Sequence, residues 1–318
     1  MIRRTSTIAL LTSIAIAVAS FLAVGSSTPA TATSASAIYW ANYNNDTIGT
    51  AGIDGSSPNQ TLITFGVQSS RAMAVDANHL YWVNVNGSIG RADLDGTNVN
   101  STFISTGGTF VSGVAVDANY VYWADSGTIG RADLDGTNSV TNFTQDVGAY
   151  GIAVNATHLY WTNADNGTVG RANLDGTNAV QNLVSGGNSL YGIALSATHI
   201  YWANYSGGTI GRANLDGTGD DQSFITGISM PAGVATDASH VYWASDGSGS
   251  IGVADLDGSI DNLALVTGAL GPAGIAVYTS ASPSTTTTTT SVSTSTTVVS
   301  TSSTTTASGD PIAPTFAG

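Results

Sequence analysis

The tripeptide LYW at positions 80–82 and the stretch IGRADLDGTN at positions 89–98 decide the fold of this chain, because variants of both recur along it. The Tyr-Trp dipeptide occurs six times and accounts for all six tryptophans. The pairs begin at Tyr39, Tyr81, Tyr122, Tyr160, Tyr201 and Tyr242, with spacings of 42, 41, 38, 41 and 41 residues. A nearly constant period of this size predicts repeated supersecondary units.

Each repeat divides into four short β-prone segments separated by turn residues. A first apolar segment leads into the Tyr-Trp segment, a third segment of the Ile-Gly-Arg-Ala type ends in Leu-Asp-Gly, and the fourth segment is more polar. The first segments lie at 72–75, 113–116, 151–154, 192–195, 233–236 and 274–277. Runs of this length without helical periodicity predict an all-β protein. Four strands in about forty residues are typical of a blade of a β-propeller.

The two ends of the repeat region predict six blades and a closed ring. The region begins at Ile38 with a second-strand sequence, and it ends at 274–278 with a first-strand sequence. Each end lacks what the other supplies. Pairing 274–278 with 38–42 would therefore complete a sixth blade of four antiparallel strands and remove the edges of an open array.

Charge and cysteine content exclude several classes of function. The chain has no lysine, no glutamate and no cysteine, and all 21 acidic residues are aspartates. Phosphate-backbone binding needs clustered basic residues, so nucleic acid is not an expected partner. A disulfide framework and a thiolate metal site are both impossible. We therefore expect the aromatic core to stabilise the fold. We also expect the protein to be a monomer.

Composition divides the chain into three parts. Residues 1–32 are predicted to be a signal peptide, with Arg3 and Arg4 before an apolar run at 8–24 and the A-x-A sequence at 30–32. The alternative is an uncleaved membrane anchor. Residues 33–278 form the predicted propeller. Residues 279–318, rich in Ser and Thr, are predicted to be a disordered linker or stalk. We thus expect a secreted protein, extracellular or associated with the cell surface, without a membrane span in the mature chain.

The Tyr-Trp pair and the following Ile-x-Arg-Ala-x-Leu-Asp-Gly pattern resemble the class B (YWTD) repeats of low-density lipoprotein receptors, over residues 38–278. The resemblance implies a six-bladed β-propeller, and stand-alone repeats in secreted bacterial proteins look most similar. The fourth position of the motif departs from the pattern. It is occupied by Asn42, Asn84, Asp125, Asn163, Asn204 and Ser245, so hydrogen bonds that the family makes with Asp would depend largely on Asn.

Three sets of repeated polar residues are interpreted as structural. The four histidines share one repeat position, in the turn before the second strand, and should not converge on a metal or a catalytic site: His79, His158, His199 and His240. The Asp-x-Asp-Gly-Thr-Asn segments at 93–98 and 133–138 resemble short calcium loops, and residues 255–258 keep the start of that pattern. These segments also suit hairpin turns, which we favour. No cofactor is therefore expected, although calcium stays an alternative. Arg91, Arg131, Arg171 and Arg212 suggest pairing within or between blades.

Residues that break the repeat are better candidates for binding. The loops that enter the first strands and those that join second to third strands share one rim of a propeller. These positions carry Arg71, Ser112, Tyr150, Tyr191, Tyr43, Tyr205, Asp125, Asp165 and Asp246. Exposed Tyr with a few polar groups is the composition of a recognition surface. The alternative is that Tyr150 and Tyr191 only plug the channel.

The sequence therefore predicts a non-catalytic scaffold that binds a protein or glycan through this rim. A metal-dependent enzyme of the lactonase or lyase kind is one alternative, and a purely structural envelope protein is another. The enzymatic alternative has less support because glutamate is absent and the histidines lie in repeat turns. No catalytic residue and no metal ligand is assigned.

Overall fold

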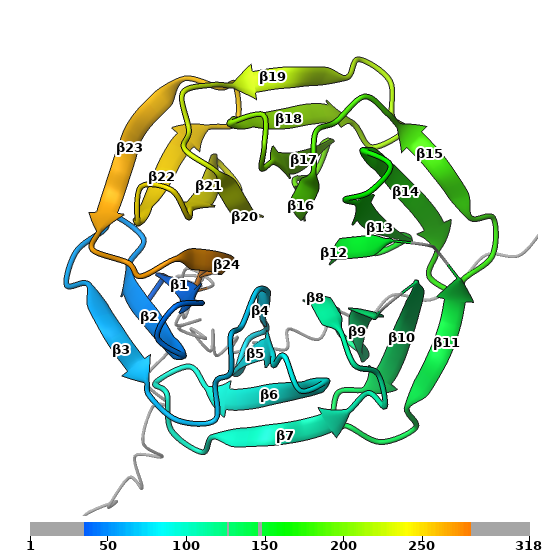
Figure 1. The fold of residues 1–318 in the computed structure, drawn as a ribbon, viewed down its shortest axis with the longest axis horizontal. Coiled ribbons are helices and arrows are strands. Elements are labelled where there is room, and N and C mark those ends of the chain that lie inside the picture. The colour runs from blue at the N-terminus through cyan, green and yellow to red at the C-terminus, as the bar shows by residue number, and fades with distance from the viewer. Residues whose placement is uncertain (1–34, 126, 146–147, 281–318) are drawn as a thin grey trace, which may run out of the picture. The chain divides into compact units, whose positions relative to one another are not determined.

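The computed structural model describes residues 35–125, 127–145 and 148–280, which form 24 strands and no helix. Six sheets of four antiparallel strands surround a central axis (Figure 1). This arrangement confirms the predicted six-bladed propeller. Within the described residues no helix is long and apolar enough to cross a membrane. The predicted signal peptide and most of the predicted stalk lie outside the described residues.

The strands of each blade occupy equivalent places from the axis outward. The innermost strands are β4 (Met73–Val75), β8 (Val111–Val116), β12 (Ala149–Val154), β16 (Leu190–Leu195), β20 (Pro231–Thr236) and β24 (Pro272–Tyr278). The second strands carry the Tyr-Trp pairs: β1 (Ala37–Asn42), β5 (His79–Val83), β9 (Tyr120–Asp125), β13 (His158–Asn163), β17 (His199–Asn204) and β21 (His240–Ser245). The third strands are β2 (Thr47–Gly52), β6 (Ser88–Asp93), β10 (Thr128–Asp133), β14 (Thr168–Asn173), β18 (Thr209–Asn214) and β22 (Ser250–Asp255). The outermost strands are β3 (Asn59–Ile63), β7 (Asn100–Ser105), β11 (Val140–Gln145), β15 (Val180–Val184), β19 (Asp221–Ile225) and β23 (Ile260–Thr267).

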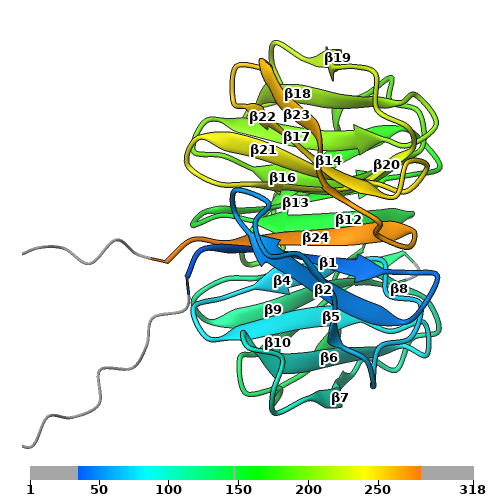
Figure 2. The ribbon, with the colours of Figure 1, turned by 90° about the vertical axis from the view of Figure 1, so that its left-hand side faces the viewer.

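The ring closes through the pairing of β24 with β1, as predicted. Ala37 lies opposite Tyr278 and Ile38 lies opposite Val277 in this antiparallel pair. Just beyond them, the Oγ atoms of Ser36 and Ser280 lie 3.3 Å apart. In Figure 2 the two strands run side by side, and β24 ends at the face of the ring where β1 begins.

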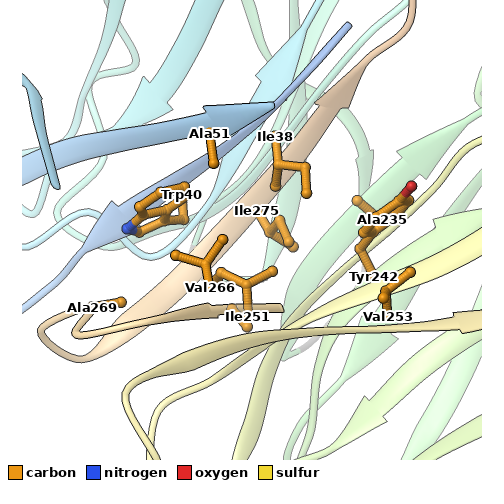
Figure 3. Close-up of a cluster of buried hydrophobic side chains, with 11 residues drawn as sticks. Ile38, Trp40, Ala51, Ala235, Tyr242, Ile251, Val253, Val266, Ala269 and Ile275 are labelled. Carbon is orange, nitrogen blue, oxygen red and sulfur yellow. The ribbon is translucent and has the colours of Figure 1, made fainter. Parts of the chain in front are cut away.

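The core lies between blades as well as within them. In one cluster, Trp40 and Ile275 of one blade pack against Tyr242, Ile251 and Val266 of the preceding blade (Figure 3). All six Trp side chains have no exposed surface. Burial of such a large apolar area contributes roughly 4–6 kcal/mol for each Trp before the entropy of ordering is subtracted. The Tyr-Trp repeats therefore supply the contacts that join neighbouring blades.

The repeated arginines join blades through backbone carbonyls. Arg91 Nη1 donates to the carbonyl of Leu134 at 3.1 Å, and Arg171 Nη1 donates to that of Leu215 at 3.1 Å. Arg131 and Arg212 make the corresponding bonds to Leu174 and Leu256, at 3.5 and 3.3 Å. Each acceptor belongs to the Leu-Asp-Gly turn of the next blade. The predicted pairing between blades is confirmed, with a main-chain oxygen as the acceptor.

The Asp-Gly segments form hairpin turns between third and outermost strands. Gly96 and Gly136 have φ angles of 82° and 86°, in the region that favours glycine. Asp95 Oδ1 accepts hydrogen bonds from the backbone N–H of Thr97 at 2.9 Å and from its hydroxyl at 2.6 Å. These bonds, of which the hydroxyl bond is the largest cause, lower the pKa of Asp95. The preferred turn interpretation is therefore confirmed.

Candidate functional site: an aromatic cavity at the mouth of the ring

One end of the central axis opens into a cavity of about 350 Å³. It is surrounded by the first residues of innermost strands, by the loops that precede these strands and by the loops that follow the second strands. Its walls are formed by Tyr43, Asn44, Arg71, Tyr150, Tyr191, Tyr205, Ala232, Asp246, Gly271 and Ala273. Beneath it the inner strands enclose a second space of only about 40 Å³, and Arg71 lines both. We call the larger space the mouth cavity.

Three tyrosines form a continuous stack on one wall of the mouth cavity. The ring centroids of Tyr150 and Tyr191 lie 4.3 Å apart, and those of Tyr191 and Tyr205 lie 4.4 Å apart. Tyr150 and Tyr191 occupy equivalent positions on the adjacent inner strands β12 and β16, whereas Tyr205 follows β17. Stacked rings of this kind present a rigid surface with little side-chain entropy to lose on binding.

A guanidinium group lies at one end of this stack. Arg71 Nη1 donates to the hydroxyl of Tyr150, and Arg71 Nη2 donates to that of Tyr43, each at 3.0 Å. The Arg71 Cζ atom also lies 4.8 Å from the centroid of the Tyr43 ring and 5.8 Å from that of Phe110. Burial would lower the pKa of Arg71, but the hydrogen bonds to Tyr150 and Tyr43 raise it overall.

A carboxylate lies at the other end of the stack. The hydroxyl of Tyr205 donates to Asp246 Oδ2 at 2.9 Å. Burial and this hydrogen bond raise the pKa of Tyr205 to about 12. Burial also raises the pKa of Tyr150, although Arg71 acts in the opposite direction. Both phenols are therefore protonated at neutral pH. Together, the hydrogen bonds and ring stacks of the cavity wall link five blades, from Tyr43 to Asp246.

Six of the nine predicted rim residues line the mouth cavity: Tyr43, Arg71, Tyr150, Tyr191, Tyr205 and Asp246. The other three lie elsewhere. Ser112 is 1% exposed, and its hydroxyl donates to the carbonyl of Ala149 in the next blade at 3.2 Å. Asp125 is 8% exposed and lies at the end of β9, where most other blades have a buried Asn. Asp165 is exposed in the turn after β13.

Sequence reasoning missed Asn44, Gly271 and Phe110. Phe110 is 41% exposed, and its ring centroid lies 6.4 Å from that of Tyr150. Asn44 and Gly271 meet because the N–H of Tyr43 donates to the carbonyl of Gly271 at 3.0 Å. Asn44 lies in the same loop as Tyr43, and Phe110 and Gly271 lie in the loops that lead into β8 and β24. The repeat indicates these loops as part of the rim but does not indicate which residue of each loop reaches the cavity.

The histidines lie at the opposite face and belong to four different blades. Among the described residues, one group has three potential metal ligands, His240, Asp255 and Asp261, with ligand atoms within 4.8 Å of one another. His240 Nδ1 lies 3.2 Å from Asp237 Oδ1, which also accepts a hydrogen bond from the His240 N–H. This contact belongs to the turn itself. The absence of a bound metal remains a prediction.

Comparisons with solved structures identify the same architecture. A chain in the crystal structure of a nidogen/laminin complex has a TM-score of 0.66 and 21% sequence identity, with 77% of this chain and 99% of that chain covered. A streptogramin B lyase has a TM-score of 0.53 and 17% sequence identity, with 75% of this chain and 82% of the lyase chain covered. A protein of unknown function from Bacteroides caccae has a TM-score of 0.56 and 13% sequence identity, with 77% of this chain and 99% of that chain covered.

The sequence matches no protein-family model, and a search of curated proteins gives no match. At identities of 21% and below, the structural likenesses show the fold alone. The six-bladed propeller implied by the resemblance to YWTD repeats is thus confirmed as a fold.

Proposed function

We propose that this chain is a non-catalytic binding propeller that captures a protein or glycan partner at the mouth cavity. The observation that carries the proposal is the linked set of side chains from Tyr43 through Arg71, Tyr150, Tyr191 and Tyr205 to Asp246. It lines a cavity of about 350 Å³, within the size range of ligand sites.

The asymmetry of the cavity supports a role in recognition. Five positions that are equivalent by repeat carry Arg71, Tyr150, Tyr191, Ala232 and Ala273 along its wall. A channel that only needed filling would be served by the same side chain in every blade. Tyr and Arg are also the residues that most often dominate binding energy at interfaces, because each combines a large contact area with polar groups.

The position of Ser36 and Ser280, near the two ends of the described propeller, suits a displayed binding protein. The mouth cavity lies beside Tyr43, after the end of β1, whereas Ser36 precedes its start and lies next to Ser280. Residues 279 and 280, with which the predicted stalk begins, thus lie at the face opposite the cavity. Secretion and attachment through residues 279–318 are part of this proposal.

The likeness to a streptogramin B lyase carries less weight for function. Among the residues that the structure describes, Asp246 is the one carboxylate side chain that lines the mouth cavity, and none of these lining residues is a histidine. General acid–base chemistry usually needs a group with a pKa near the working pH. The protonated tyrosines of the wall are better suited to hydrogen bonding and contact with a ligand.

A direct binding screen tests the proposal. The full chain would be probed against a glycan array and a set of extracellular proteins, and any positive partner would be titrated by calorimetry. We expect the double variant Tyr150→Ala/Tyr191→Ala to bind at least tenfold more weakly while it retains its β-sheet circular dichroism. Leu263→Ala is the matched control, because Leu263 is 47% exposed on the outermost strand β23. Equal binding by both variants would refute the role of the mouth cavity.

A further inference from the structure

Arg71 is the cationic residue of the mouth cavity, and the partners that hold it are neutral. Its two terminal nitrogens donate to the hydroxyls of Tyr150 and Tyr43, and aromatic rings flank its guanidinium. Within residues 35–125, 127–145 and 148–280, no carboxylate oxygen lies within 4.0 Å of these nitrogens. A partly buried charge without a counter-ion is unfavourable unless a ligand supplies one.

The four repeated arginines have a different environment. Each donates to a leucine carbonyl of the next blade, as Arg91 does to Leu134. They also lie near carboxylates of the Asp-Gly turns, since Arg91 helps to lower the pKa of Asp135 and Arg212 helps to lower that of Asp257, in each case less than hydrogen bonds in the turn. These contacts give the four arginines a structural role, which is to hold neighbouring blades together. Arg71 also reaches other blades, but its acceptors are the phenol hydroxyls of Tyr43 and Tyr150, and among the described residues it bonds neither a leucine carbonyl nor a turn carboxylate.

The hydrogen-bond arrangement leaves donors available at the cavity. A guanidinium has five N–H groups, and Arg71 uses two of its terminal groups in the bonds to the tyrosines. Each phenol that accepts a hydrogen bond from Arg71 keeps its own O–H proton as a donor. The three side chains therefore form a cluster of donors around one positive charge, and all three line the cavity.

We propose that the mouth cavity binds a carboxylate group of its ligand, held by N–H groups of Arg71 and by the hydroxyl protons of Tyr43 and Tyr150. Charge-assisted hydrogen bonds of this kind are short and about twice as strong as neutral ones. Asp246 lies at the other end of the tyrosine stack, where it accepts from Tyr205. Its negative charge would repel the ligand carboxylate and so favour one orientation in the cavity. This inference rests on the proposed function and adds the chemical class of the ligand.

Small carboxylates test the inference directly. The full chain would be labelled with ¹⁵N-arginine, and the Nε–Hε resonance of Arg71 would be assigned with Arg71→Lys. Acetate and glucuronate would be titrated at constant ionic strength, each against its uncharged counterpart, acetamide or glucose. We expect a saturable shift of the Arg71 resonance with carboxylates and none with the neutral compounds. An unchanged Arg71 resonance, or equal shifts with the neutral compounds, would overturn the inference.

Charge variants supply the second measurement. Glucuronate, relative to glucose, should raise the melting temperature of the wild-type chain and of Arg131→Met, because Arg131 bonds Leu174 outside the cavity. It should have no such effect on Arg71→Met, which changes the net charge equally. A rise that survives Arg71→Met would contradict the inference. If a partner from the binding screen loses affinity with the Tyr150→Ala/Tyr191→Ala variant but not with Arg71→Met, the proposed function stands and the carboxylate inference fails.

Discussion

Gly90 lies opposite Trp82 on the neighbouring strand, and a Cβ atom at position 90 would overlap the indole ring. The same relationship recurs in all six blades, where the glycine of the Ile-Gly-Arg-Ala type segment faces the tryptophan of the Tyr-Trp pair: Gly49, Gly90, Gly130, Gly170, Gly211 and Gly252. These glycines are required by close approach of a side chain to the backbone. The Tyr-Trp pair and the Ile-Gly-Arg-Ala type segment therefore recur together because the tryptophan of the first packs on the glycine of the second.

Gly90→Ala should destabilise the protein by about 1–3 kcal/mol or more, because the methyl group overfills a packed site. In a strand without this contact, the same change would be neutral or stabilising. The free energy of unfolding in urea measures the effect. In the background of Trp82→Leu the cost should be much smaller, since the shorter side chain leaves room, and equal costs in both backgrounds would show that the overlap is not the cause.

Blade number and ring closure could be predicted because the Tyr-Trp period is long and each repeat carries its own turns. A break in the pattern at either end then identifies the strands that must pair, here β1 and β24. The repeat also gave the face on which Arg71, Tyr150 and Tyr191 lie. The place of a residue within a blade is set by the backbone repeat, so it can be predicted from the sequence.

Side-chain direction and loop packing could not be predicted in this way. Ser112 shares a repeat position with Tyr150, yet its short hydroxyl bonds a carbonyl between blades instead of reaching the mouth cavity. Phe110 lies in a loop of irregular length, so no register relates it to Arg71. The structural explanation of Gly90 likewise needed the cross-strand register.

Stability should fall at alkaline pH because buried tyrosines ionise more readily in the unfolded chain than in the folded chain. Burial is the main cause that raises the pKa of Tyr39 from 10.0 to about 12 in the folded chain. The pKa values of Tyr81, Tyr122 and Tyr242 are also raised, by burial and then by interactions with Asp76, Asp117 and Asp237. A raised pKa means that the folded state holds its proton more tightly, so the stabilisation is complete below pH 10.0 and is lost as pH rises through about 12.

Urea denaturation across this range measures the alkaline effect. We expect a constant free energy of unfolding between neutral pH and the onset of tyrosine ionisation, and a decline above it. Tyrosine absorbance, followed in parallel, should show that part of the phenols ionises only on unfolding. Tyr39→Phe should reduce the slope of the decline, because one buried phenol is removed. A flat profile up to the pKa of Tyr39 would contradict this account.

Calcium and chelator should leave the melting temperature unchanged. The carboxylates of the Asp-Gly turns already accept hydrogen bonds within each turn, as Asp135 Oδ1 does from the N–H and hydroxyl of Thr137 at 2.9 and 2.6 Å. An ion bound at a hundredfold excess over its dissociation constant would stabilise the chain by about 2.7 kcal/mol, which a melt detects easily.

A shift with any divalent cation would contradict the metal-free prediction, and two variants would locate the ion. Asp261→Asn would abolish the shift if the ion lay beside His240 and Asp255. Asp95→Asn would reduce it if the ion lay in an Asp-Gly turn.

Asp125→Asn should stabilise the protein. At the equivalent position, Asn84 Nδ2 donates to Ser88 Oγ at 3.2 Å and to the carbonyl of Ser101 at 3.0 Å, while its Oδ1 accepts from the N–H of Gln68 at 2.9 Å. A carboxylate cannot make the two donated bonds. In the described structure Asp125 Oδ1 is buried without a hydrogen-bond partner. Replacing it with an amide should therefore raise the free energy of unfolding by about 1–2 kcal/mol.

The reverse substitution in the preceding blade is the matched control. Asn84→Asp should lower the free energy of unfolding by at least as much as Asp125→Asn raises it, because it removes donors from a satisfied site and buries a charge. Both changes alter net charge by one unit in opposite directions, so a salt titration separates the local effect from overall repulsion. If Asp125→Asn instead destabilised the chain, the carboxylate would have a partner that the amide cannot replace. Asp125 would then return as a candidate for binding at the rim.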